Sequence, residues 1–239
     1  MVITGGGRGI GAATARLAAA RGYKVCINYF RDQKSARALA GDIGGLAVQG
    51  DVASEQDVVR MFQTVDEKLG RVSVLVNNAG IVDRGTRVEA MSAARIQRML
   101  TVNVIDSFLC AREAVKRMST RHGGQGGAII NVSSIAAKLG GSGEYVDYAA
   151  SKGAIDTLTI GLAKEVAEEG IRVNSVRPGV IHTDIHASGG EPGRVERVRI
   201  AVPMKRGGQP EEVARAILWL LSPEASYSTG TFIDVSGGR

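Results

Sequence analysis

The chain has little of several features that mark specialised protein classes. Its 239 residues include two cysteines, three histidines and ten aromatic residues: one tryptophan, five tyrosines and four phenylalanines. Two cysteines do not make a disulfide framework, and no Cys/His spacing resembles a zinc site. Cys26 and Cys110 both lie in apolar stretches. We therefore predict two reduced, buried thiols and no metal site.

Long apolar runs are also missing. No segment reaches the ~18 uninterrupted apolar residues that a membrane span needs. Met1 leads directly into Val-Ile-Thr-Gly-Gly, without the basic region or cleavage site of a secretory signal. These absences predict a cytoplasmic protein that has no membrane partner.

The charge is basic, with a net value of +6 and a pI near 9.5. Such a balance suits nucleic acid, but it suits an anionic cofactor or an acyl carrier equally well. Lysine and arginine are spread along the chain, and stacking aromatic residues are scarce. We therefore do not expect a nucleic-acid partner.

Short β-rich apolar runs alternate with longer helical patterns through the chain. Strands are predicted at residues 1–4, 24–28, 46–49, 72–76, 128–132, 172–177 and 231–235. Helices are predicted at residues 10–21, 34–41, 54–69, 93–104, 107–119, 147–168 and 210–221. This alternation implies βαβ units with right-handed crossovers. It predicts a single doubly wound α/β domain over residues 1–239, with a seven-stranded parallel sheet and helices on both faces.

One segment, residues 183–206, breaks this alternation. It contains Gly189-Gly190 and Pro192-Gly193 and no clear strand. Long irregular segments inside compact domains are often functional loops. This one follows the carboxyl end of a strand, where open α/β sheets bind ligands. We predict that it forms a substrate lid.

Glycine is abundant, with 32 residues, and it is concentrated in the first strand-to-helix turn, Thr4-Gly-Gly-Gly-Arg-Gly-Ile-Gly11. Glycines there allow a sharp turn and let backbone N–H groups approach a pyrophosphate. The helix N-terminus adds a partial positive charge. The turn predicts a dinucleotide site.

The glycine spacing, Gly5, Gly9 and Gly11, differs from the Gly-x-Gly-x-x-Gly of ordinary dinucleotide folds and resembles that of the short-chain dehydrogenase/reductase family. Further motifs of that family follow in order over nearly the whole chain. They are Asp51-Val52, Asn77-Asn-Ala-Gly80, Asn103, Ser133-Ser134, Tyr148-Ala-Ala-Ser-Lys152, and Pro178-Gly179 with Thr183. The resemblance implies a Rossmann-type fold and a nicotinamide-dependent oxidoreductase.

Tyr148 and Lys152 are four residues apart and therefore share one helix face. A free tyrosine has a pKa of ~10, and a neighbouring ammonium is expected to lower it. Tyr148 could then act as a general acid on a carbonyl or as a base on an alcohol. Tyr145 lacks such a partner, since Ala149 is its i+4 residue. We expect Tyr145 to be a pocket wall or a surface residue.

The resemblance extends the catalytic set to Ser134, which would orient the substrate oxygen, and Asn103, which would help to resupply the proton. It also implies that Lys152 binds the nicotinamide ribose, Asp51 the adenine amino group, and residues 178–183 the nicotinamide. The complete set of expected cofactor residues is Gly5, Gly7, Arg8, Gly9, Ile10, Gly11, Asn28, Tyr29, Arg31, Asp51, Val52, Asn78, Ala79, Gly80, Tyr148, Lys152, Pro178, Gly179, Ile181 and Thr183.

The second strand indicates which nicotinamide cofactor is used. An acidic residue at its end normally binds the adenosine ribose and selects NAD. Here no acidic residue occurs before Asp32, whereas Arg8 and Arg31 could flank a 2′-phosphate. We therefore expect NADP(H), with NAD(H) as the alternative.

The substrate is a small carbonyl or alcohol, and three classes compete. They are a 3-oxoacyl thioester on an acyl carrier protein, a sugar such as glucose, and a xenobiotic or secondary-metabolite ketone. Enoyl reduction is disfavoured, because enoyl reductases usually place six residues between tyrosine and lysine, and this chain has three. A different class also stays open, a nicotinamide-binding regulator without turnover.

By the same resemblance we expect a homotetramer or a homodimer. The helix that contains Tyr148 and the last helix, with Trp219, are the expected interfaces.

Overall fold

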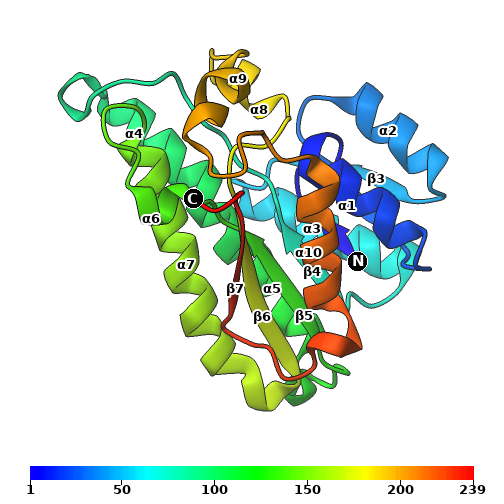
Figure 1. Cartoon of the computed structure of the whole chain (residues 1–239). Helices are drawn as coiled ribbons and strands as arrows, with labels where there is room; N and C mark the ends of the chain where they lie inside the picture. Colours follow the sequence, from blue (N-terminus) through cyan, green and yellow to red (C-terminus); the bar gives the residue numbers. More distant parts are fainter.

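In the computed structural model, which describes residues 1–239, seven strands form one parallel sheet in the order β3-β2-β1-β4-β5-β6-β7 (Figure 1). The strands are β1 Val2–Ile3, β2 Cys26–Tyr29, β3 Leu46–Gln49, β4 Val74–Asn77, β5 Gly127–Val132, β6 Ile171–Pro178 and β7 Phe232–Val235. The order reverses between β1 and β4, which is the switch point where doubly wound sheets bind ligands. The predicted fold is confirmed.

Helices cover both faces of the sheet. The longer ones are α1 Gly9–Ala19, α2 Gln33–Asp42, α3 Glu55–Leu69, α4 Ala93–Leu100, α5 Asp106–Met118, α7 Val146–Val166 and α10 Pro210–Leu221. The short ones are α6 Ala136–Leu139, α8 Ile185–Ser188 and α9 Arg194–Val198. Single turns lie at Val88–Ala90, Thr101–Ile105, Thr120–His122, Ala167–Glu169, Arg199–Ala201 and Pro223–Ala225.

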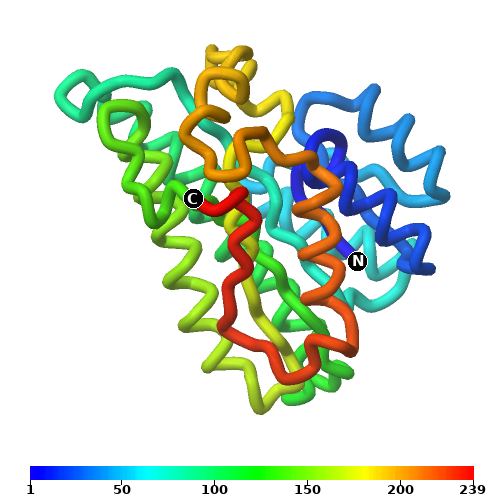
Figure 2. Tube along the Cα trace, viewed as in Figure 1, coloured from blue at the N-terminus to red at the C-terminus, as the bar shows by residue number.

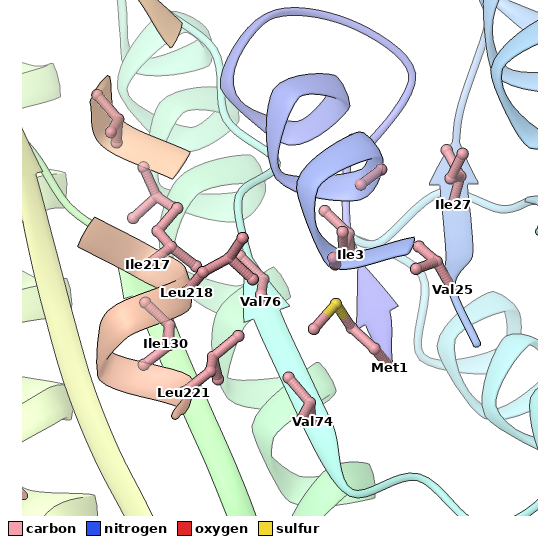
Figure 3. Close-up of a cluster of buried hydrophobic side chains, with 14 of the residues drawn as sticks. Met1, Ile3, Val25, Ile27, Val74, Val76, Ile130, Ile217, Leu218 and Leu221 are labelled. Carbon is pink, nitrogen blue, oxygen red and sulfur yellow. The ribbon is translucent and has the colours of Figure 1, made fainter. Parts of the chain in front are cut away.

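Alternate strand residues divide the core into two layers. Ile3, Val76 and Ile130 join a cluster that contains Ile217 and Leu221 of α10 (Figure 3). The preceding residues of the same strands, Val2, Leu75 and Ile129, point the other way into a second cluster with residues of α3, α5 and α7. This is the two-residue period of a strand that is buried on both faces.

Local signals placed two helix starts correctly. Ser54 caps α3 by accepting a hydrogen bond from the backbone N–H of Asp57 at 3.4 Å. Pro210 is the first residue of α10, where Gln209 and Glu212 form a capping box. These signals act within one helical turn, so they can be recognised without the rest of the chain.

Three expectations need correction. The first strand is shorter than predicted, with two residues. The two helices expected at 93–104 and 107–119 are joined without a break by the π-helical turn Thr101–Ile105. The lid segment 183–206 is not irregular throughout, because it contains α8, α9 and a 3₁₀ turn. These helices are too short for hydrophobic periodicity to reveal them.

The chain between β6 and α10 crosses the carboxyl end of the sheet, at the top of the view in Figure 2. The polar motifs that end β1, β4, β5 and β6 lie at the same end. None of the helices has the length and apolar character that a bilayer crossing requires.

Candidate active site

The glycine-rich turn, residues 4–11, is fixed to the end of β4 by neutral hydrogen bonds. The hydroxyl of the fully buried Thr4 accepts from the backbone N–H groups of Asn78 and Ala79, each at 3.0 Å. The Asn78 side-chain amide donates to the carbonyls of Thr4 at 2.9 Å and Gly5 at 3.1 Å. These contacts hold the turn in one position beside the switch point.

The turn forms a cradle with no room for side chains. A Cβ on Gly11 would lie 2.6 Å from Nδ2 of Asn78 and 2.8 Å from the carbonyl oxygen of Gly5. Gly5 and Gly9 have φ angles of 59° and 54°, which disfavour other residues. No side chain caps α1, whose first turn contains no acidic residue. An uncapped helix N-terminus at this edge fits an anionic pyrophosphate; Gly7, the exposed Arg8 and Ile10 complete the turn.

At the end of β2, the predicted residues divide into buried and exposed ones. Asn28 is buried and accepts from the N–H of Gly5 at 3.3 Å while donating to the carbonyl of Gly50 at 3.0 Å. The Asn28 amide therefore links the glycine-rich turn to the end of β3. Tyr29 is also buried, whereas Arg31 is exposed, with its guanidinium 5.1 Å from the ring centre of Phe30.

The first acidic residue after β2 serves as a helix cap. Asp32 accepts from the backbone N–H of Ser35 at 3.1 Å, and this bond lowers the pKa of its carboxyl, with a smaller contribution from the charge of Arg8. Asp51, after β3, is half-buried and accepts from the N–H of Ala53 at 3.0 Å, next to the buried Val52.

Tyr148, Lys152 and Ser134 meet where β5 ends and α7 begins. Lys152 is buried, and its ammonium donates to the carbonyl of Val132 at 2.9 Å and lies 5.8 Å from the ring centre of Tyr148. A Cβ on Gly80 would lie 3.6 Å from the lysine nitrogen, so the end of β4 comes close to it. Ser134 and Tyr148 line the same pocket.

The expected lowering of the tyrosine pKa by the lysine is wrong for this arrangement. Burial raises the pKa of the Tyr148 phenol, and a hydrogen bond with Ser134 opposes that effect. Burial also lowers the pKa of Lys152, against the charges of Asp106 and Asp156. The ammonium is directed to the carbonyl of Val132, and desolvation dominates for both groups.

Asn103 is fully buried, and its side chain is engaged by the protein. It accepts from the N–H of Ile81 at 2.8 Å and donates to the carbonyl of Ile81 at 3.0 Å and to the hydroxyl of Ser151 at 3.1 Å. Ser151 in turn donates to the carbonyl of Tyr148 at 2.6 Å. The Asn103 amide thus positions the start of α7. Sequence reasoning missed Ser151, although it directly precedes Lys152.

Residues 178–183 lead from the sheet into the lid. Pro178 ends β6, and a Cβ on Gly179 would lie 2.8 Å from the Cα of Ser236. Ile181 is buried and bridges to Gly208. The methyl of Thr183 lies 3.2 Å from where a Cβ on Gly9 would be, so the lid begins against the glycine-rich turn.

A pocket of about 370 Å³ opens beside Tyr148, and nine of its seventeen lining residues are hydrophobic. Tyr145 is one of its walls, as expected, with its ring 6.1 Å from that of Tyr148 in an edge-on arrangement. The other lining residues are Val82, Ser134, Ile135, Ala136, Leu139, Gly141, Ser142, Glu144, Gly179, Val180, Ile185, His186, Arg194, Val198 and Arg239.

Ion pairs fasten the lid across this pocket. Glu144, in the loop before α7, accepts from Arg194 at 2.7 Å and from Arg197 at 2.8 Å. Glu191, within the lid, accepts from Arg194 at 2.9 Å. The Arg194 guanidinium also lies 4.5 Å from the ring centre of Tyr145. The two contacts of Glu144 could not be predicted from the sequence, because they join residues about 50 positions apart.

Comparison with known proteins places this site among oxidoreductases. Residues 5–239 match the family model described as enoyl-(acyl carrier protein) reductase. The uncharacterized oxidoreductase YgfF of Escherichia coli is 58% identical over 243 residues, which cover 100% of this chain and 98% of the relative. The 3-oxoacyl-[acyl-carrier-protein] reductase of Bos taurus is 42% identical and covers 99% of this chain and 95% of its own length.

Solved structures agree in fold. The 3-ketoacyl-(acyl-carrier-protein) reductase of Brucella melitensis, complexed with NADH, superposes with a TM-score of 0.93 at 34% identity, covering 100% of this chain and 96% of that one. A short chain dehydrogenase of Burkholderia cenocepacia in complex with NADP gives a TM-score of 0.90 at 31% identity, with coverages of 99% and 96%.

Proposed function

The chain belongs to the short-chain dehydrogenase/reductase family, and from that premise we propose that it catalyses reversible hydride transfer between NADP(H) and a carbonyl or alcohol substrate. The observation that carries this proposal is that Ser134 and Tyr148 line one pocket, with the ammonium of Lys152 5.8 Å from the ring centre of Tyr148. The uncapped glycine cradle beside it fits the pyrophosphate.

In this proposal the chain's residues bind, orient and move a proton. Residues 5–11 would hold the pyrophosphate, Asp51 the adenine, Lys152 the ribose, and residues 178–183 the nicotinamide. When bound, the cofactor supplies or accepts the hydride. Ser134 would orient the substrate oxygen, and Tyr148 would protonate it during reduction.

The preference for NADP(H) is supported by the end of β2. Asp32, the first acidic side chain there, caps α2. Arg8 and Arg31 are both exposed, so both guanidinium groups are available to contact a 2′-phosphate. NAD(H) is the alternative, and the two solved relatives divide between NADH and NADP. Comparing the dissociation constants of NADPH and NADH for this protein tests the preference.

Among the substrate classes, the pocket favours a 3-oxoacyl thioester or another apolar ketone over a sugar. A polyol needs many hydrogen-bond partners, whereas nine of the seventeen lining residues are hydrophobic, and Glu144 and Arg194 are already paired with each other. Relatives that are 42% and 41% identical are named 3-oxoacyl-[acyl-carrier-protein] reductases. The spacing of Tyr148 and Lys152 still argues against enoyl reduction.

The decisive experiment measures NADPH consumption with a short 3-oxoacyl thioester in the wild type and in two tyrosine variants. Tyr148→Phe removes the proton donor, so turnover should fall by about 10²–10⁴-fold while NADPH still binds. Tyr145→Phe is the matched control, because it keeps the pocket wall and should retain most of the activity. Wild-type turnover by Tyr148→Phe would contradict the mechanism. If the wild-type protein binds NADPH but turns over no carbonyl substrate, the result would favour the alternative of a nicotinamide-binding regulator without turnover.

Self-association is part of the same proposal. Trp219 on α10 and Ile160 on α7 are 41% and 42% exposed. Ile96, Leu100, Ile105 and Phe108 add exposed apolar surface on α4, α5 and the π-helical turn between them. Such surface favours a homotetramer or a homodimer, which light scattering after size-exclusion chromatography would distinguish. A cytoplasmic location belongs to the proposal as well, and the buried free thiols of Cys26 and Cys110 suit a reducing compartment.

A further inference from the structure

Asp106 is a buried carboxylate that the proposed mechanism does not use. It begins α5, directly after the π-helical turn that carries Asn103. Its exposure is 1%, and its single hydrogen bond is the one that Oδ1 accepts from the hydroxyl of Ser107 at 3.0 Å. Oδ2 is buried without a partner. A buried carboxylate with so little hydrogen bonding is costly unless a positive charge lies nearby.

The half-buried carboxylate of Asp156, on α7, offers a comparison. Its Oδ1 is also buried without a partner, but its Oδ2 accepts from Nε of Arg177 at 2.9 Å, and both side chains are 13% exposed. Asp106 has no such salt bridge with an arginine or lysine. Burial raises the pKa of Asp106 to about 7, so above that pH it carries a charge with no bonded cation, whereas Asp156 has Arg177.

The lysine near this part of the chain is Lys152. A Cβ on Gly80 would lie 3.4 Å from Oδ1 of Asn103, three residues before Asp106, and 3.6 Å from Nζ of Lys152, so the ammonium lies beside the turn that leads into Asp106. The other ionisable groups around Asp106 are acidic: Asp51 after β3, and the Cys110 thiol one turn along α5. Asn77 of β4 donates its amide to the carbonyl of Ser107 at 3.4 Å, so this face of α5 meets a neutral side chain of the sheet.

Lys152 also lacks a bonded partner of opposite charge. Its ammonium is buried and donates to a neutral group, the carbonyl of Val132. Burial lowers the pKa of the lysine, and the negative charge of Asp106 opposes this more strongly than that of Asp156 does. Conversely, burial raises the pKa of Asp106, and the charge of Lys152 is the largest opposing effect. Each group thus favours the charged form of the other.

We propose that Asp106 is a positioning residue that serves as the buried counter-charge of Lys152 and keeps the lysine protonated at neutral and mildly alkaline pH. Asp106 does not touch the pocket that Ser134 and Tyr148 line, so it acts through Lys152. The consequence for turnover rests on the proposed function, because it requires that Lys152 take part as an ammonium.

The test compares the pH dependence of kcat/KM between about pH 6 and pH 10 in Asp106→Asn and the wild type. Without the charge of Asp106, less opposes the effect of burial on Lys152, so the pKa of the lysine falls. The decline of kcat/KM at alkaline pH should then move to lower pH by about one unit. Asp106→Glu should restore the wild-type limb in part. Asp156→Asn is the matched control, and its shift should be smaller, because Asp156 acts less strongly on the lysine.

A second readout does not depend on turnover. In protein labelled with ¹³C at the lysine ε-carbons, the Lys152 resonance, assigned by its loss in Lys152→Met, reports the protonation of this amine directly. Its titration midpoint should be lower by about one unit in Asp106→Asn. Asp106→Ser removes the same charge with a smaller side chain and should give the same direction, which keeps the test available if Asp106→Asn does not fold.

The outcomes separate the two proposals. An unmoved Lys152 midpoint in folded Asp106→Asn or Asp106→Ser protein would overturn the counter-charge, whatever the activity. If the titration midpoint of Lys152 is lower in Asp106→Asn but the wild type turns over no carbonyl substrate, the counter-charge role of Asp106 is supported and the proposed function is rejected. A lowered midpoint together with a shifted alkaline limb supports both.

Discussion

The glycine-rich turn at residues 4–11 and the lid at residues 183–206 face each other across the carboxyl end of the sheet, but different forces hold them. Neutral hydrogen bonds from Thr4, Asn28 and Asn78 fix the turn, and the first two of these residues are buried. Ion pairs from Glu144, Glu191 and Glu212 fix the lid, and the carboxylates are 34–37% exposed.

This difference predicts different responses to solution conditions. Salt screens exposed charges, and acid removes the charge of carboxylates, whereas neither changes a hydrogen bond between an amide and a hydroxyl. High salt or acid should therefore loosen the lid over the substrate pocket, whereas the glycine-rich turn, which would bind the cofactor phosphates, should stay fixed. Variants in each region can test this contrast.

The largest effect is expected from a methyl group in the turn. Gly11→Ala places a Cβ 2.6 Å from Asn78 Nδ2 and 2.8 Å from the Gly5 carbonyl, so the cradle must open. We expect a loss of about 1–3 kcal/mol of stability and a fall in NADPH affinity of about tenfold or more, which corresponds to ~1.4 kcal/mol. Thermal unfolding and fluorescence titration measure these changes.

The matched control lies in the lid. Gly193 has a φ of −83°, and a Cβ there would meet nothing within 4 Å. Gly193→Ala should leave stability and NADPH affinity close to those of the wild type. Equal losses in both variants would show that the turn is no more constrained than the lid.

An intermediate effect is expected from the latch between the lid and the loop before α7. Glu144→Gln removes the charge that binds Arg194 and Arg197. Half-exposed ion pairs contribute about 0.5–1 kcal/mol, so KM should change by about two- to fivefold with kcat nearly constant. The wild-type KM should also drift toward that of the variant as salt approaches 1 M. A KM that does not respond to salt or to the substitution would contradict the latch.

The smallest effect concerns acid. Arg206 at the end of the lid binds Glu212 of α10 at 2.8 and 2.7 Å, and its hydrogen bonds lower the pKa of that carboxyl to about 2. A lowered folded-state pKa means that the stabilisation is complete above the unfolded pKa of ~4.3 and is lost as the pH falls toward 2. Hydrogen exchange near residues 206–212 should therefore rise in acid more than exchange near residues 4–11.

Glu212→Gln is the control for this experiment, because it removes the titrating group and should flatten this part of the acid response. If residues 4–11 and residues 206–212 loosened together over the same pH range in both proteins, the contrast between the regions would be wrong.

Much of the fold could be predicted from the sequence. The strand at 46–49 and the helix at 210–221 agree with the structure at both ends, because caps, proline and apolar periodicity act over a few residues. The lid helices α8 and α9 could not be predicted, since they have four and five residues and are held by side chains from distant loops.

The candidate site divides in the same way. The order of the motifs and the spacing of Tyr148 and Lys152 follow from the sequence, because one helix places them on one face. The sequence could not show that Asn103 is engaged by Ile81 and Ser151. It also could not show that burial raises the pKa of Tyr148. Desolvation depends on everything that packs around a group, and most of those residues are far away in the chain.

The sequence by itself determined the alternation of strands and helices, the glycine cradle and the placement of the proposed catalytic residues at one end of the sheet. These features arise from local backbone preferences and from the two periodicities of strands and helices. Only the tertiary structure decided which charges are buried, which are paired, and which are left to act at a distance. Asp106 and Asp156 look alike in the sequence, yet in the folded chain Asp156 pairs with Arg177, whereas Asp106 is buried without a salt bridge.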